Sequence, residues 1–113
     1  CDVATRQDCA NLGDPFACCA GSWERHGPGI EVKMLWSDKV LLIRCEPGAA
    51  EDCHPQPVDE DEHIIVIAGD LVIGGRVLQT GDYVRIPAGV SHPAMHTPTG
   101  CMLYTQYVPV AHG

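Results

Sequence analysis

The sequence predicts an all-β protein, a sandwich or barrel of the jelly-roll kind. Beyond residue 30, apolar residues occur in short runs rich in Val, Ile and Leu, and Gly, Pro or Asp interrupts these runs at regular spacing. Nothing after Asp14 repeats with the helical period of 3.6 residues. About seven or eight short strands of this kind form a small closed structure, which encloses a ligand cavity.

The predicted strands follow one another with only turns between them, apart from one longer loop. Gly74-Gly75 is a two-residue hairpin turn, a type that requires positive φ at both positions. The strands are predicted at residues 30–36, 39–46, 63–68, 70–73, 76–79, 82–86, 94–97 and 101–108.

Residues 1–29 have neither the period of a strand nor that of a helix, and they contain several glycines and prolines. We predict an irregular N-terminal arm with at most one short helix, beginning near Asp14-Pro15 as an N-cap followed by proline. The arm carries Phe16 and Trp23, which we expect to pack against a partner subunit. The predicted organisation is an arm (1–29), one barrel domain (30–110) and a tail (111–113), since 113 residues supply one core.

The charge excludes two classes of partner. The formal net charge is −8 with only seven Lys and Arg residues, whereas nucleic acids and anionic membrane surfaces bind basic faces. No apolar run approaches the roughly 18 residues that a membrane span needs. We therefore expect neither nucleic acid nor a membrane as a partner.

Cysteine is frequent, and the odd number of seven cannot all pair within one chain. The strand pattern supplies a core, so we favour reduced thiols and a cytoplasmic protein over a disulfide scaffold. Zinc binding in the arm is disfavoured, because Cys18 and Cys19 are adjacent and no Cys-x-x-Cys spacing occurs. The cysteines are Cys1, Cys9, Cys18, Cys19, Cys45, Cys53 and Cys101.

The loop and strand of residues 48–69 carry the first candidate site residues. In extended backbone, His54 and Gln56 share one face and Pro55 faces away. Glu62 opens an apolar run, where a carboxylate is costly unless a partner holds it. The intervening acidic residues 59–61 are predicted to form a solvated loop at the barrel mouth.

Residues 81–96 carry the second group, a strand followed by a Pro-x-Gly turn and two histidines. His92 lies just past the turn, and His96 is four residues further on, on the same face of an extended strand. His96 is a candidate acid or base lining the cavity.

These two stretches resemble the paired signature of the cupin superfamily. Its first motif reads Gly, five residues, His-x-His, three or four residues, Glu, six residues, Gly. Its second reads Gly, five residues, Pro-x-Gly, two residues, His, three residues, Asn. The positions that match at the family's separations are Gly48, His54, Glu62 and Gly69 in the first motif, and Gly81, Pro87, Gly89 and His92 in the second.

Two positions depart from that signature. Gln56 replaces the second histidine of the first motif, with five residues between it and Glu62, and His96 replaces the closing asparagine. The resemblance extends over about residues 29–108. The Gly-Asp-Tyr-Val-Arg-Ile-Pro run and Gly100-Cys101 look most like the cupin domain of zinc-binding anti-sigma factors and like acetylacetone-cleaving dioxygenases.

The resemblance implies one divalent metal bound by His54, Glu62 and His92. Gln56 would be a fourth, weaker donor; the alternatives are a hydrogen bond to a metal-bound water or a role in shaping the loop. Two imidazoles and a carboxylate with open positions suit Fe(II), which we favour, and Mn, Ni or Zn fit nearly as well. The resemblance also implies a homodimer.

Three functions are compatible with this site. The leading hypothesis is a non-haem Fe(II)-dependent dioxygenase acting on a small oxygen-rich substrate such as a β-dicarbonyl, with Gln56 or His96 orienting substrate or water. The second is a redox-neutral metal-dependent isomerase, lyase or cyclase, and the third is a non-catalytic sensor of a small molecule or metal. The fold does not decide among them, because one barrel hosts many functions.

Overall fold

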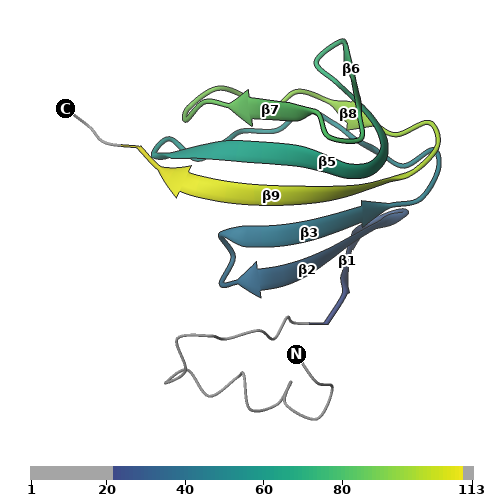
Figure 1. Cartoon of the computed structure of the whole chain (residues 1–113). Coiled ribbons are helices and arrows are strands. Elements are labelled where there is room, and N and C mark those ends of the chain that lie inside the picture. The colour runs from purple at the N-terminus through teal and green to yellow at the C-terminus, as the bar shows by residue number, and fades with distance from the viewer. Residues whose placement is uncertain (1–21, 111–113) are drawn as a thin grey trace.

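The computed structural model of this protein describes residues 22–110, which form nine β-strands and no helix (Figure 1). No helical membrane span therefore occurs in this part of the chain. The strands are β1 (Glu24–Gly27), β2 (Ile30–Trp36), β3 (Val40–Cys45), β4 (Ala50–Glu51), β5 (Glu60–Ile73), β6 (Arg76–Gln79), β7 (Tyr83–Ile86), β8 (Met95–His96) and β9 (Cys101–Pro109).

All strand pairs are antiparallel, and the long strand β5 belongs to both layers of the curled sheet. Its first part pairs with β9 on one side and β7 on the other, and β9 continues the layer through β3 and β2 to β1. Its last part pairs with β6 and with β8, and β8 pairs in turn with β4. The result is the curled, jelly-roll type of all-β fold that the sequence predicts.

Strand β5 changes layer at Gly69. Its φ is +85°, and a Cβ atom there would lie 2.0 Å from the carbonyl oxygen of Gly100, so only glycine fits this close approach of two backbones. The sequence prediction broke the strand here into 63–68 and 70–73, whereas the backbone continues through the bend. The hairpin turn at Gly74-Gly75 has positive φ at both positions, as predicted.

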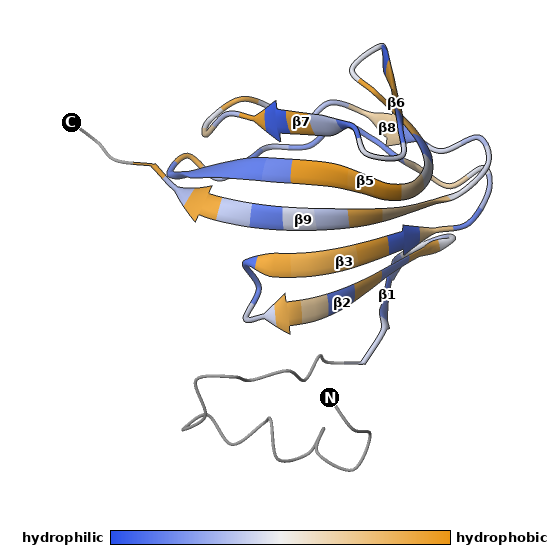
Figure 2. Cartoon of the chain, viewed as in Figure 1, coloured by the Kyte–Doolittle hydropathy of each residue, from blue (hydrophilic) through white to orange (hydrophobic). Residues whose placement is uncertain are grey.

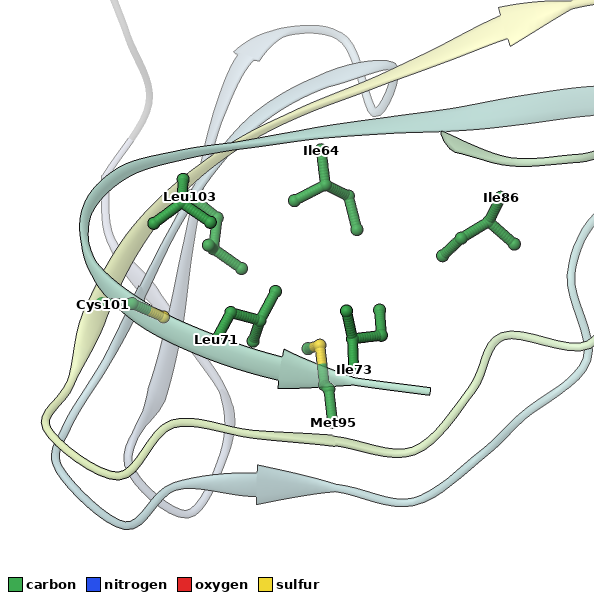
Figure 3. Close-up of a cluster of buried hydrophobic side chains, with 8 residues drawn as sticks. Ile64, Leu71, Ile73, Ile86, Met95, Cys101 and Leu103 are labelled. Carbon is green, nitrogen blue, oxygen red and sulfur yellow. The ribbon is translucent and has the colours of Figure 1, made fainter. Parts of the chain in front are cut away.

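The core lies between the two layers. Ile64 and Leu103 point inward from β5 and β9, toward Leu71, Ile73 and Met95 on the opposite side (Figure 3). Burying each large apolar side chain contributes about 1.5–3 kcal/mol, so this cluster is the main stabilising feature of the barrel. Figure 2 shows apolar residues along β3 and the second part of β5, and hydrophilic residues at the start of β5.

Several predicted features differ from the structure or lie outside it. Strands β1 and β4 were not predicted, because each is short and lacks an alternating apolar pattern. Within the chain, Trp23 stacks on Arg44, whose guanidinium carbon is 4.1 Å from the centre of a Trp23 ring, and its contact with a partner subunit stays a prediction. The predicted helix near Asp14, the cysteines before residue 20, Phe16 and the tail 111–113 are outside the described residues.

Candidate metal centre

Two histidines are held side by side by a backbone bridge. His54 donates its N–H to the carbonyl of His92 at 3.1 Å, and His92 donates back to the carbonyl of His54 at 2.7 Å. Side chains of such a directly opposed pair lie on the same face. The two rings are stacked, with centroids 4.4 Å apart and planes 16° from parallel.

Each of these histidines precedes a proline, and the proline carbonyl determines which ring nitrogen carries the hydrogen. Nδ1 of His54 lies 3.0 Å from the carbonyl oxygen of Pro55, and Nδ1 of His92 lies 2.8 Å from that of Pro93. A carbonyl only accepts, so both Nδ1 atoms donate. In neutral rings this leaves a lone pair on each Nε2, the tautomer that metal-binding histidines use.

Two carboxylates face these Nε2 atoms. Oε1 of Glu51 is 3.1 Å from Nε2 of His54, and Oε1 of Glu62 is 3.5 Å from Nε2 of His92. The side chain of Glu62 is only 3% exposed, and its Oε1 accepts a hydrogen bond of 2.9 Å from the amide of Gln56. Burial raises the pKa of the Glu62 carboxyl, and the proximity of His92 and Gln56 partly offsets this effect.

This junction suits a cation. Carboxylate oxygens and imidazole lone pairs repel one another at these distances unless a proton or a metal ion lies between them. Glu51, His54 and His92 each offer one ligand atom, and these atoms all lie within 4.8 Å of one another. Two imidazoles and a carboxylate form a donor set for divalent Fe, Mn, Ni or Zn, so the residues present fit a divalent metal.

A cavity of about 200 Å³ opens beside these groups. Burial, followed by the charges of Glu62 and Glu51, raises the pKa of Tyr107, so its phenol stays protonated at the cavity wall. Apolar side chains from β2, β3 and β8 cover much of the remaining wall: Ile30, Val32, Leu41, Ile43 and Met95.

Comparison with known proteins identifies the family. The sequence model of the ChrR cupin-like domain matches residues 17–111, which is most of the chain. The chain is a cupin of this family. No match to a curated protein sequence was found.

Solved structures similar to this cupin share its fold at low sequence identity. An RmlC-like cupin from Shewanella frigidimarina is 24% identical (TM-score 0.64, 81% of this chain and 86% of that chain). An acetylacetone dioxygenase from Acinetobacter johnsonii is 14% identical (TM-score 0.63, 76% and 67%). The cupin domain of Drosophila melanogaster CENP-C is 14% identical (TM-score 0.69, 96% and 83%). At these identities the similarity shows the fold alone.

The structure brings four of the five predicted site residues together in this cupin. His54, Glu62 and His92 line the cavity, and Gln56 is buried against Glu62. Gln56 contacts Glu62 through its amide nitrogen, so here the amide holds the carboxylate. His96 lies apart: its side chain is exposed on β8 and is absent from the cavity wall, which its neighbour Met95 lines instead.

Two residues at this site were not anticipated. Glu51 was part of the loop before Glu62 with no pattern to distinguish it, and His26 was part of the predicted irregular arm. In the structure, both line the cavity and contact each other through Nε2 of His26 and Oε2 of Glu51, at 3.0 Å. Glu51 lies on the short strand β4, three residues before His54. That spacing is the only feature of the nearby sequence that could have indicated its role.

The acidic residues between Gln56 and Glu62 are more structured than predicted. Asp61 lies in β5, where Oδ1 accepts the N–H of Ala88 at 2.7 Å and Oδ2 accepts Nε of Arg85 at 2.9 Å. These hydrogen bonds hold the pKa of the Asp61 carboxyl below its usual value. Glu60 is buried and accepts a hydrogen bond from Lys39. Asp61 therefore ties the turn before His92 to the strand that carries Glu62.

Proposed function

We propose that this cupin is a mononuclear, non-haem Fe(II)-dependent dioxygenase acting on a small oxygen-rich substrate such as a β-dicarbonyl. Glu51, His54 and His92 would hold the metal, with Glu62 as a second carboxylate beside His92. The observation that carries the proposal is the pair of Nε2 atoms directed at carboxylate oxygens, with their Nδ1 atoms already donating to proline carbonyls.

The cavity supports a small substrate. Its volume of about 200 Å³ is below the roughly 300–1,000 Å³ of pockets for drug-sized ligands. Side chains such as Val32, Leu41 and Ile43 would surround the carbon skeleton, and the Tyr107 phenol in the cavity wall would supply a hydrogen-bond donor. A divalent metal at the neighbouring site would supply Lewis-acid polarisation of the substrate oxygens and, as Fe(II), chemistry with O₂.

Gln56 has a defined part in this proposal. Its amide donates to Glu62 and thereby keeps one oxygen of a buried carboxylate oriented toward His92. In the proposal, Gln56 therefore orients a carboxylate, whereas the histidine that the family signature has at this position binds the metal directly. The buried carboxylate also adds negative charge at the site, which favours a divalent cation.

We further propose a cytoplasmic homodimer. Ile65 and Tyr83 are directly opposed on β5 and β7, and both side chains, together with Ile67, are 40–52% exposed. Such a patch on one face of a sheet supports contact with a second copy.

Oxygen uptake tests the proposed reaction. The protein is loaded with Fe(II) under anaerobic conditions and exposed to O₂ with a panel of β-dicarbonyls, beside protein loaded with Zn(II). O₂ consumption that requires both substrate and Fe(II) is the expected result. Equal turnover with Zn(II) and no O₂ consumption would instead select redox-neutral chemistry. Metal binding without turnover of any panel member would favour a sensor.

A further inference from the structure

His26 occupies an irregular position in the edge strand β1. Arg25 pairs with Glu31 and Gly27 pairs with Ile30, so the register shifts between them and His26 is the extra residue of a β-bulge. Bulges redirect a side chain and are frequent next to active sites. In this cupin the bulged strand runs along the cavity, and His26 forms part of its wall.

The side chain of His26 reaches the metal-binding carboxylate. Its Nε2 lies 3.0 Å from Oε2 of Glu51, while Oε1 of the same carboxylate faces Nε2 of His54 at 3.1 Å. A carboxylate accepts hydrogen bonds only, so Nε2–H of His26 is the donor. Glu51 is thus held through both oxygens, one by a hydrogen-bond donor and one at the proposed metal position.

Little else fixes Glu51. Strand β4 has only two residues, and within residues 22–110 it pairs only with β8, itself two residues long. The side chain of Glu51 is 20% exposed and that of His26 is 58% exposed. The carboxylate therefore depends on a contact from a strand 25 residues earlier in the chain to keep one orientation.

We propose that His26 is a positioning residue of the metal centre, which locks Oε2 of Glu51 so that Oε1 remains directed at the metal. This role rests on the proposed metal site, and no position of the cupin signature corresponds to His26. Hydrogen-bond partners of metal ligands typically contribute about 10–100-fold in metal affinity. The contact also couples the edge strand β1 to the metal, because binding that orders Glu51 stabilises its partner.

The test is Co(II) titration followed by absorption spectroscopy, with Zn(II) calorimetry as a second measure of affinity. Three variants are compared with the unaltered protein: His26→Phe, His26→Gln and Glu31→Gln. Phe fills the space without a donor, and the Gln side-chain amide places a donor close to the position of histidine Nε2. Glu31→Gln is the control, because Glu31 pairs with Arg25 beside His26 in the backbone ladder but its side chain is not part of the cavity wall.

We expect His26→Phe to weaken Co(II) binding by about 10–100-fold, with the spectrum at saturation unchanged. His26→Gln should retain affinity within about threefold, and Glu31→Gln should match the unaltered protein. Hydrogen exchange of β1 amides should slow on metal binding in the unaltered protein and not in His26→Phe.

Two outcomes would overturn the inference. Unaltered affinity in His26→Phe would remove the positioning role, and a changed spectrum at saturation would make His26 a direct ligand instead. Failure of the unaltered protein to bind Co(II) and Zn(II) is a separate result, because it would refute the proposed metal site itself. Circular dichroism of each variant establishes that the fold is retained; exposure of His26 makes substitution there compatible with folding.

Discussion

Replacing Gly69 with alanine should destabilise the barrel far more than the same change at Gly48. Both glycines belong to the first cupin motif, and both have a φ of +85°. The difference lies in their surroundings: a Cβ atom at Gly69 would lie 2.0 Å from the oxygen of Gly100 and 2.8 Å from Cα of Cys101, whereas nothing lies within 4 Å at Gly48. Comparing the two variants therefore separates the cost of a positive φ from the cost of the close contact between backbones.

The magnitudes follow from that geometry. Alanine in the left-handed region costs about 1–2 kcal/mol, and both variants incur this cost. Gly69→Ala also needs about 1 Å of separation between backbones, because the clashing atoms are backbone and cannot rotate away. This separation would break one or two hydrogen bonds, such as that from Asp70 N–H to the Gly100 carbonyl at 3.3 Å, and would shift core side chains. Together these effects add about 2–5 kcal/mol to the loss of unfolding free energy. We expect a total of about 3–7 kcal/mol, against about 1–2 kcal/mol for Gly48→Ala.

Urea unfolding followed by circular dichroism measures both variants against the unaltered protein. Gly48→Ala should unfold at a modestly lower midpoint, and Gly69→Ala should be largely unfolded in buffer or have a much lower midpoint. Equal losses of unfolding free energy in the two variants would refute the close-approach argument, since φ strain alone would then account for both.

Three further predictions concern the core, acid stability and the thiols. Leu103 has no exposed surface, so Leu103→Ala should lower the free energy of unfolding by about 2–5 kcal/mol in the same urea assay; a smaller loss would mean that the core closes around the cavity. Desolvation raises the pKa of the Asp70 carboxyl, but the hydrogen bond from the Thr99 N–H and hydroxyl donors nearby hold it below its usual value. The stabilisation from the Asp70 carboxylate is therefore complete above the carboxyl's pKa in the unfolded chain, and it is lost as the pH falls through its lower pKa in the folded protein. Asp70→Asn should lower the free energy of unfolding at pH 7 and make it depend less on pH in the acid range. An unchanged dependence of stability on pH would contradict this prediction. Iodoacetamide should label exposed Cys53 well before buried Cys101 in the native protein, as peptide mass spectrometry would show; equal rates would contradict the described burial.

The strands could be predicted because their information is local. Alternating and β-branched residues predicted β2 with its observed bounds at Ile30–Trp36 and most of β5 and β9. Gly69 was predicted to end a strand, because a single sequence does not distinguish a turn between two strands from a bend within one continuous strand. The distinction depends on Gly100, which is far away in the chain.

The site could be predicted only in part, for the same reason. Motif spacing placed His54, Glu62 and His92 in one site, and the structure brings them together. The contact of Glu51 with His26 depends instead on a bulge in an edge strand and on the packing of β1 across the cavity. No residue pattern near either position records that long-range arrangement, so each looked like an ordinary surface residue.

Metal content of the purified protein tests the central claim most directly. The protein is prepared without chelator or metal-affinity resin and analysed by mass spectrometry, beside Glu51→Gln and, as a control whose side chain is not part of the cavity wall, Glu31→Gln. We predict one divalent metal per chain in the unaltered protein and in Glu31→Gln, and its loss from Glu51→Gln. Full occupancy in Glu51→Gln, or no metal in the unaltered protein even after incubation with Fe(II) and Zn(II), would contradict the account.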